Sequence, residues 1–320
     1  MKNAVLLIPM FVILLGCNSF QPGEGSSVPN EANIVGGETY SENDQNLPGA
    51  KSVVRLDLSV RHDYVDAFGQ PRSETTPQIC TATLINRRAI LTAAHCFRSQ
   101  TGIDLKRSGP ANRPTFYHNH RRGSRFSVEA TATFPHAPGE SRRITRFVIH
   151  PSYRGVIVSI RNNRMALHHG HDLAVALLDQ PAPQSVPSAE IFSERLAENT
   201  RVNVISFGYG LTGYTEEHRG TAGQFRYVRL QGHTSQGSLS ISQRSGRGIC
   251  VGDSGGPAFI QRGGKAFVFA VHSALDDLAV RLTKTSYEME TVEECREKSI
   301  SVLVSNYVPW IQKTIKRLNP

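Results

Sequence analysis

Short stretches in which apolar and polar residues alternate recur along most of the chain. Residues 52–60 (SVVRLDLSV) and 126–134 (FSVEATATF) place an apolar residue at every second position, which is the period of a half-buried strand. Residues 201–210 (RVNVISFGYG) follow a similar pattern. Residues 265–274 (KAFVFAVHSA) are apolar at consecutive positions, which predicts a central strand. The body of the chain therefore predicts many short strands.

The spacing changes near the C-terminus, in residues 306–318 (NYVPWIQKTIKRL). Trp310, Ile311 and Ile315 recur at helical spacing, and the last turn is basic, as the C-terminal end of a helix favours. Many short strands over a chain of 320 residues are typical of barrels and sandwiches. We therefore expect an all-β fold closed by one C-terminal α-helix.

Two segments interrupt the strand pattern and are interpreted as surface insertions. Residues 97–125 are rich in arginine and poor in strand-type alternation, and residues 275–294 are mixed in character and end in acidic residues. The formal net charge of +9 suits an acidic partner. Because no basic stripe is interleaved with aromatic residues, we do not expect that partner to be nucleic acid.

The start of the chain predicts export. Lys2 precedes an apolar run at residues 4–16 (AVLLIPMFVILLG), which is too short and too poorly flanked for a stable membrane span. We interpret residues 1–16 as a signal peptide. No other stretch is long and apolar enough to cross a bilayer.

The apolar run ends in LLGC (14–17), which resembles the lipobox of bacterial lipoproteins. The resemblance implies cleavage before Cys17 and a lipid on its thiol, which would hold the exported chain to a membrane. The alternative is a plain signal peptide that contains a cysteine. Residues 17–33 would then be a lipidated linker or propeptide, and residues 34–320 a single domain.

The chain has five cysteines, an odd number for a protein exported to a compartment that permits disulfides. If Cys17 carries lipid, Cys80, Cys96, Cys250 and Cys295 remain, and two disulfides would account for all of them. The count alone leaves three pairings open.

Three short motifs carry candidate chemistry. They are LTAAHCF around His95, GHDLAVALL around Asp172 and GICVGDSGGPAF around Ser254. Together, and in this order, they strongly resemble the chymotrypsin-like serine peptidases, the family that includes trypsin. The resemblance covers nearly everything from Ile34 to the C-terminal helix. It implies two six-stranded antiparallel β-barrels with the site in the cleft between them, and a protein or peptide as substrate.

The chemistry needs each of these residues for a physical reason. The hydroxyl of Ser254 is a poor nucleophile at neutral pH and requires a base within hydrogen-bond reach. His95 has the proton affinity to take that proton and return it to the leaving amine. Asp172 would fix the tautomer of the imidazole and stabilise its charged form. By family resemblance, the backbone N–H groups of Gly252 and Ser254 would form the oxyanion hole.

The stretch IVGG at residues 34–37 is an apolar pair in a polar surrounding. In the family, a cut before this stretch frees an α-ammonium that folds inward and pairs with the acid beside the nucleophile. The resemblance therefore implies a zymogen that is activated by cleavage before Ile34, with an ion pair from Ile34 to Asp253. The residue before the cut is Asn33, whereas many relatives carry Arg or Lys there, so a different convertase is needed.

The resemblance also implies two disulfides near the site. Cys80 would pair with Cys96 and clamp the loop beside His95, and Cys250 would pair with Cys295 and brace the specificity pocket. Since no cysteine besides Cys17 precedes the cut, no disulfide would hold the propeptide to the domain, and activation would release the enzyme from its membrane anchor.

Specificity is expected at the position six residues before the nucleophile, which is Gly248. Trypsin-like enzymes carry an aspartate there that holds an arginine or lysine of the substrate. Its absence predicts a pocket for apolar or small side chains, although Arg247 could favour an acidic one and a glutamate within 288–294 could reach the pocket. The pocket wall falls on His272 or Ser273, because the segment AVHSAL aligns in two ways.

The histidines His168, His169 and His171 beside Asp172 could be taken for a metal site. Zinc requires three or four ligands that converge tetrahedrally, and Asp172 is already assigned to His95. We therefore expect an exposed loop, no metal and no cofactor.

Two other functions stay open. A non-catalytic binding protein on the same fold would be expected to lack a member of the triad or an oxyanion glycine, and this sequence lacks none. A polyanion-binding surface, formed by residues 98–125 and 142–146, could coexist with catalysis.

Overall fold

The structure is a computed structural model of the whole chain. It describes residues 34–35, 37–44, 46–66, 68–98, 103–108, 115–120, 125–153, 157–161, 164–168, 171–211, 222–275, 278–282, 287–291, 295 and 298–318. The predicted signal peptide, the lipidation site at Cys17 and the linker up to Asn33 lie outside the described residues.

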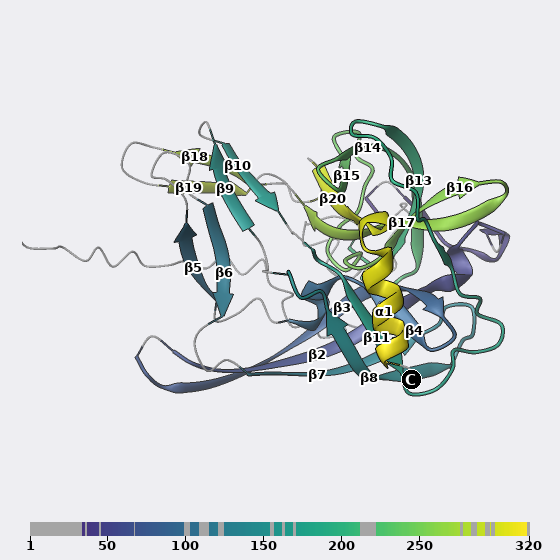
Figure 1. Cartoon of the computed structure of the whole chain (residues 1–320), viewed down its shortest axis with the longest axis horizontal. Coiled ribbons are helices and arrows are strands. Elements are labelled where there is room, and N and C mark those ends of the chain that lie inside the picture. Colours follow the sequence, from purple (N-terminus) through teal and green to yellow (C-terminus); the bar gives the residue numbers. More distant parts are fainter. Residues whose placement is uncertain are drawn as a thin grey trace, which may run out of the picture.

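Six antiparallel strands close a first barrel, barrel 1, in the order β11-β4-β3-β2-β7-β8 (Figure 1). Their bounds are β2 Val53–Val65, β3 Pro71–Asn86, β4 Ala89–Thr92, β7 Arg125–Thr133, β8 Ser141–Ile149 and β11 Ala174–Leu178. The alternation predicted in β2 points Leu56, Leu58 and Val60 inward, where each is at most 4% exposed. Burying apolar area of this kind is the main driving force for closing the barrel.

Six further strands form barrel 2, in the order β14-β13-β16-β17-β20-β15. The first and last strands of this order, β14 and β15, also pair with each other, which closes the barrel. Their bounds are β13 Arg201–Gly208, β14 Arg226–Ser235, β15 Ser238–Ser242, β16 Pro257–Arg262, β17 Lys265–Leu275 and β20 Lys298–Leu303. Two short strands attach to this barrel: β1 Glu38–Thr39 pairs with β14, and β12 Glu190–Ile191 pairs with β17. The predicted all-β fold with two six-stranded barrels is confirmed.

Smaller sheets lie beside the barrels, at the left of Figure 1. One has the order β10-β9-β6-β5 and the other pairs β18 with β19. Their bounds are β5 Ile103–Ser108, β6 Thr115–His120, β9 Ile157–Arg161, β10 Arg164–His168, β18 Leu278–Leu282 and β19 Tyr287–Thr291. The expectation that residues 97–125 are poor in strands is therefore wrong. β5 and β6 pair with each other, and β6 also pairs with β9, a segment far away in the sequence, so this second pairing leaves no local signal.

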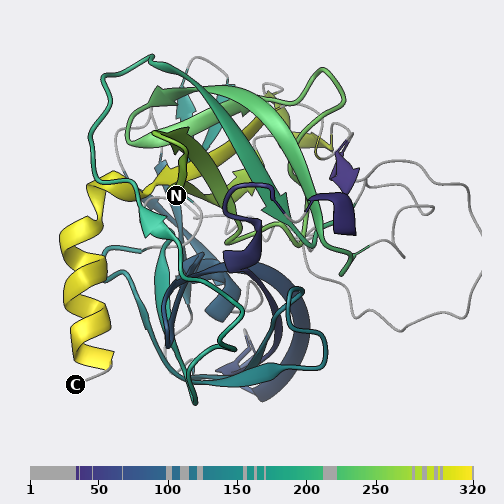
Figure 2. The same cartoon turned by 90° about the vertical axis from the view of Figure 1, so that its right-hand side faces the viewer.

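The described chain ends in the predicted helix, α1, at Val308–Leu318. Figure 2 shows that α1 leaves barrel 2 and runs down beside barrel 1. There it contacts β11 and β8, burying Ile311 and Leu318, and the side chain of Arg146 donates to the Leu318 carbonyl. Short 3-10 helices occur at Glu42–Asp44, Ala50–Ser52, Ala94–Phe97 and Val304–Asn306. Within the described ranges, no helix has the length and apolar character to cross a membrane.

Candidate active site

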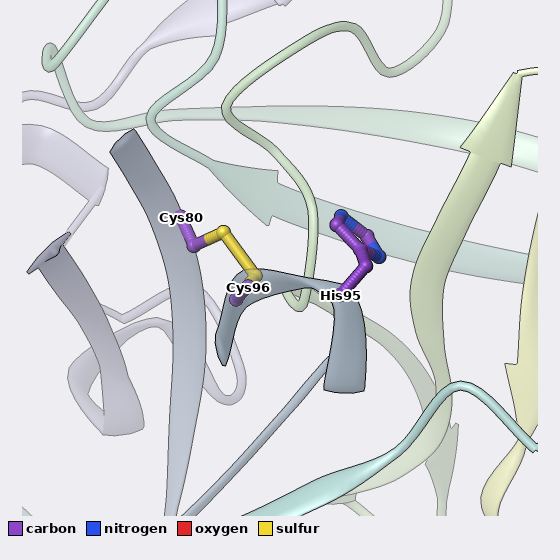
Figure 3. Close-up of side chains that lie close together, drawn as sticks. All are labelled: Cys80, His95 and Cys96. Carbon is purple, nitrogen blue, oxygen red and sulfur yellow. A yellow bond between two sulfur atoms is a disulfide. The ribbon is translucent and has the colours of Figure 1, made fainter. Parts of the chain in front are cut away.

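His95 lies in the 3-10 helix Ala94–Phe97, directly after the fully buried strand β4. A disulfide from Cys96 to Cys80 fastens this helix to β3 (Figure 3). On the strand side, the hydroxyl of Thr92 donates to the Thr81 carbonyl at 2.8 Å. The backbone that carries the imidazole is therefore held by a covalent bond and by the wall of barrel 1.

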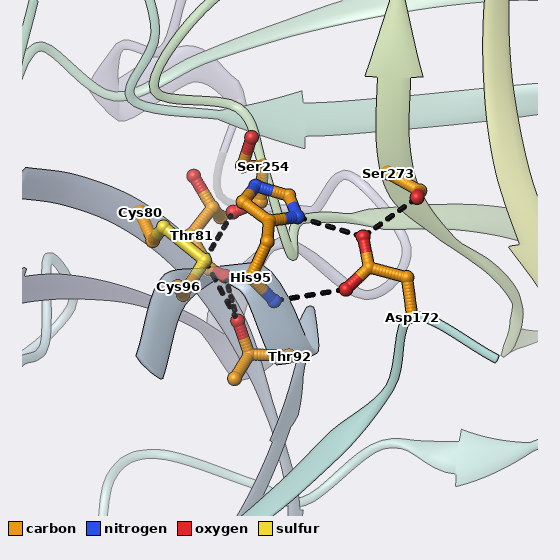
Figure 4. A network of polar contacts seen from close by, with 8 residues as sticks. All are labelled: Cys80, Thr81, Thr92, His95, Cys96, Asp172, Ser254 and Ser273. Atoms are coloured by element: carbon orange, nitrogen blue, oxygen red, sulfur yellow. Dashed lines mark hydrogen bonds and ion pairs between the residues drawn. A yellow bond between two sulfur atoms is a disulfide. The ribbon is translucent and has the colours of Figure 1, made fainter. Parts of the chain in front are cut away.

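Asp172 has no exposed surface and accepts three hydrogen bonds from described residues (Figure 4). The backbone N–H of His95 donates to its Oδ1 at 2.9 Å, and Nδ1 of the same residue lies 2.7 Å from its Oδ2. The third bond comes from the hydroxyl of Ser273 on β17, which donates to Oδ2 at 2.7 Å. A buried carboxylate with three donors is stabilised in its charged form.

The charge of Asp172 changes the proton affinity of His95. Burial is the largest effect on the imidazole, whose side chain is 13% exposed, and by itself it would lower the pKa. The negative charge and the hydrogen bond of Asp172 oppose it, and together they raise the pKa of His95 above its ordinary value. The imidazole is therefore a stronger base than a free histidine.

Ser254 lies on the side of the imidazole opposite Asp172, as Figure 4 shows. It belongs to the turn that precedes β16, so barrel 2 supplies the serine while barrel 1 supplies the histidine and the aspartate. The backbone N–H of Thr81 donates to the Ser254 carbonyl at 2.8 Å, and the Thr81 hydroxyl donates to the Gly252 carbonyl at 3.0 Å. These two bonds dock the serine turn against β3.

Two glycines of this turn have left-handed backbone, with φ of +97° at Gly252 and +81° at Gly255. Other residue types rarely adopt this conformation. At Gly255 the space is also closed, because a β-carbon would overlap the hydroxyl of Thr92. Gly252 and Gly255, the first two of the three glycines of GDSGG, are thus required by the path of the backbone around the serine.

Asp253, next to the serine, is fully buried, and its side chain is bonded to the backbone that follows β13 of barrel 2. Its Oδ1 accepts the N–H of Gly210, and its Oδ2 accepts the N–H of Cys250, both at 2.7 Å. Burial raises the pKa of this carboxyl to about 7, although the two bonds and the guanidinium of Arg226 counteract the rise.

Ile34 is completely buried in the core of barrel 2. Its carbonyl accepts a hydrogen bond from the N–H of Gly37, and the carbonyl of Val35 accepts one from the N–H of Gly248 at 2.9 Å. Val35 is thus bonded to Gly248, two residues before Cys250, whose N–H donates to Asp253.

The position expected at the pocket floor, Gly248, has no room for a side chain. A β-carbon there would overlap the side chain of Gln243, which is fully buried. The amide of Gln243 donates to the carbonyls of Ile249 and Cys295 at 3.0 and 2.7 Å, and its oxygen accepts the Ile249 N–H at 2.8 Å. This neutral amide is fixed by the loop around it.

His272 and Ser273 occupy different environments. Ser273 belongs to the hydrogen-bond network of Asp172. His272 is fully buried, with Nδ1 2.9 Å from the hydroxyl of Ser301. Burial lowers its pKa to about 3, against a weaker opposing effect of the Pro257 carbonyl, so its ring is neutral at pH 7. Contact of either residue with a substrate stays a prediction.

Both disulfides implied by the resemblance are formed. Cys80 bonds to Cys96, and Cys250 bonds to Cys295. The sulfurs of Cys80 and Cys96 and a ring nitrogen of His95 lie within 4.8 Å of one another, the spacing of a metal site. Because the two sulfurs are bonded to each other, they are not thiolate ligands (Figure 3).

The histidine stretch before Asp172 contributes one described side chain. His171 is exposed and stacks on His150 at a ring distance of 4.8 Å, and the hydroxyl of Tyr307 lies 3.0 Å from its Nδ1. His168 and His169 lie outside the side chains that the structure describes.

Two closed six-stranded barrels, with a histidine and a buried aspartate from one and a serine from the other, define the class of chymotrypsin-like serine peptidases. The sequence pattern of the family described as Trypsin matches residues 65–311, which is well over half of the chain. The chain therefore belongs to the trypsin family.

Three curated relatives show how distant the similarity is. The chain is 22% identical over 268 residues to "CLIP domain-containing serine protease B14" of Anopheles gambiae, covering 78% of this chain and 67% of that protein. It is 26% identical over 197 residues to "Trypsin CFT-1" of Choristoneura fumiferana, covering 58% and 66%. It is 22% identical over 210 residues to "Clotting factor G beta subunit" of Tachypleus tridentatus, covering 57% of each. The last two matches span less than two thirds of the relative's length.

Two residues of the site escaped the sequence analysis. Gln243 fills the space beside Gly248, and Arg226 acts on the carboxyl of Asp253. Both lie outside the motifs. Arg226 meets Asp253 only through the fold, whereas Gln243 comes shortly before Gly248 and Ile249 in the sequence and has one distant partner, Cys295. A basic residue at the start of a strand otherwise rich in apolar residues, as in RYVRL, is the one available signal for Arg226.

Proposed function

We propose that the chain is a serine endopeptidase in which Ser254 is the nucleophile, His95 the general base and acid, and Asp172 the residue that orients the imidazole. The observation that carries the proposal is the hydrogen bond of 2.7 Å between His95 Nδ1 and the buried carboxylate of Asp172, with Ser254 on the opposite side of the ring. Family membership makes a polypeptide the substrate class.

The reaction follows from these positions. His95 takes the proton of the Ser254 hydroxyl through Nε2 while the serine oxygen attacks the carbonyl carbon of the scissile bond. The imidazolium, stabilised by Asp172, then gives its proton to the leaving amine, and an acyl-enzyme remains. A water molecule repeats the sequence and releases the acid.

The tetrahedral intermediate carries a negative oxygen that needs fixed donors. In this proposal the N–H groups of Gly252 and Ser254 supply these donors. The left-handed backbone of Gly252 supports it, because the N–H groups there point in directions that a regular strand does not allow. Losing one such donor typically costs on the order of 3 kcal/mol of transition-state stabilisation.

A fluorophosphonate probe, which reacts with activated serines, tests this proposal. The full protein and its Ile34-started form are both exposed to the probe, together with Ser254→Ala and with Ser242→Ala, an exposed serine on β15. Labelling of the wild type and of Ser242→Ala, but not of Ser254→Ala, is expected. A folded wild type that is unlabelled in both forms would instead be a non-catalytic binding protein.

The same proposal includes activation by a cut before Ile34. The freed ammonium would pair with the buried carboxylate of Asp253 and lower its pKa from about 7. Burial of Ile34 and the bond from Gly248 to Val35 support this role, since Ile34 already packs in the core of barrel 2. Because Asn33 precedes the cut, the convertase would not be a trypsin-like enzyme.

Export and anchoring belong to the proposal as well. The structure contains two disulfides. Because disulfides form and persist in oxidising compartments, their presence supports export. A lipid on Cys17 would hold the precursor to a membrane, and the cut before Ile34 would release the domain. Fractionation of cells that express wild type and Ser254→Ala tests this. Mature enzyme that still carries the lipid contradicts release.

A further inference from the structure

Asp253 requires a cation that the uncut chain does not supply at Ile34. In the full chain the nitrogen of Ile34 is part of the peptide bond to Asn33 and carries no charge. An ionised carboxylate without exposed surface costs several kcal/mol unless a charge or enough donors compensate it. The N–H groups of Gly210 and Cys250 compensate it in part.

Arg226 donates to the residue that binds this carboxylate, Gly210, and is itself 1% exposed, the largest fully buried side chain in the described part of the molecule. It opens β14, where its register partners are Gly208 on one side and Thr39 on the other. Gly208 packs so closely against the carboxylate that a β-carbon on it would overlap Asp253. The strand register thus places Arg226 opposite a glycine that packs on the buried acid.

The guanidinium is also bonded to the backbone that binds the acid. Nη1 of Arg226 donates to the Gly210 carbonyl at 3.2 Å, while the N–H of Gly210 donates to Asp253. Nη2 donates to the side chain of Gln224 at 2.5 Å. Burial lowers the pKa of Arg226 to about 10, which leaves it protonated at pH 7, and its charge lowers the pKa of Asp253.

We propose that Arg226 is a resident counter-cation for Asp253, a positioning residue that holds the turn from Gly252 to Ser254 in working geometry before Ile34 is freed. The inference rests on the proposed function. Its consequence is that Ser254 of the uncut chain reacts at a measurable rate, which can be compared with the rate of the cut form. After the cut, the ammonium of Ile34 supplies a second positive charge, and Arg226 matters less.

The experiment measures the second-order rate of labelling of Ser254 by a fluorophosphonate. It compares the full chain, whose bond from Asn33 to Ile34 is shown intact by mass before and after labelling, with protein that starts at Ile34. Both forms are made with Arg226, with Arg226→Gln and with Arg226→Lys. The matched control is Arg229→Gln, which removes the same charge from an exposed position of the same strand.

Arg226→Gln should slow labelling of the intact chain by about 10-fold or more, the effect of roughly 1.4 kcal/mol. The Ile34-started form should slow by less than about 3-fold, because its ammonium compensates the carboxylate. Arg226→Lys should restore most of the rate of the intact chain, and Arg229→Gln should change neither form. A purely structural role would lower both forms equally.

Two results would overturn the inference. One is an equal loss in both forms, and the other is an intact wild-type chain that is inert while the Ile34-started form reacts. The second result needs no variant, so it decides the question even if Arg226→Gln fails to fold. If neither wild-type form reacts, the proposed function itself is wrong.

Discussion

Asp172 is a buried residue that binds both the backbone and the ring of His95. It receives two hydrogen bonds from His95 and one from Ser273, and it has no exposed surface. All three donors favour the ionised carboxylate. The resulting charge fixes the orientation of the ring and raises the pKa of His95.

Replacing Asp172 by asparagine should lower kcat by about 10⁴-fold, because the amide stabilises the wrong tautomer of His95. Activity requires the neutral imidazole, and the carboxylate is what raises its pKa. The acid limb of the pH profile of kcat/KM should therefore move to lower pH. Asp63→Asn, at a carboxylate 44% exposed on β2, is the control. An acid limb that stays in place would contradict this assignment.

Gly255 tests the packing of the serine turn. Gly255→Ala combines a left-handed backbone with a β-carbon that overlaps Thr92. We expect a loss of folding free energy of roughly 3 kcal/mol or more. Gly264→Ala has a similar φ of +75° but open space around it, so it should cost only about 1 kcal/mol. Urea unfolding of both variants measures the difference, and equal losses would show that backbone strain alone acts.

Side chains inside the motifs could be predicted from the sequence, whereas their neighbours could not. His95, Asp172 and Ser254 each lie within a few consecutive letters that identify the chemistry. Arg226 and Gln243 gain their roles from strands and loops elsewhere in the chain, and sequence spacing does not encode that proximity.

Among the elements, those with regular alternation were predictable. The apolar period located β2, β7 and β13, because one face of each strand must meet a barrel core. The strand β17 was located by its run of consecutive apolar residues, which is buried on both faces. The sheet of β5, β6, β9 and β10 was not found, since its strands show weak alternation and the pairing of β6 with β9 joins segments far apart in the sequence.

The two disulfides should differ in their contribution to stability. Removing Cys80–Cys96, which closes 16 residues, should cost about 3 kcal/mol of unfolding free energy by loop entropy. Removing Cys250–Cys295, which closes 45 residues, should cost about 4 kcal/mol. Paired Cys→Ala variants of each bridge, compared by urea unfolding, test the order. The reverse order would show that strain or local packing outweighs chain entropy.

At the level of the whole enzyme, substrate preference should differ from that of trypsin. No carboxylate occupies position 248, and the amide of Gln243 that fills the adjoining space has its hydrogen bonds within the loop. A peptide-library profile of protein verified to begin at Ile34 should therefore show no preference for cleavage after Arg or Lys. A preference of about 10-fold or more would mean that a glutamate from residues 288–294 reaches the pocket.

Each end of the described chain packs on the barrel that is more distant from it in the sequence. Ile34 and β1 come before barrel 1 in the sequence but pack on barrel 2, whereas α1 follows barrel 2 and packs on barrel 1. The two barrels are thus held together by terminal segments, each of which packs on the barrel at the other end of the sequence. A nick in the connection between them, at residues 179–189, would leave two fragments that stay associated until denaturant separates them.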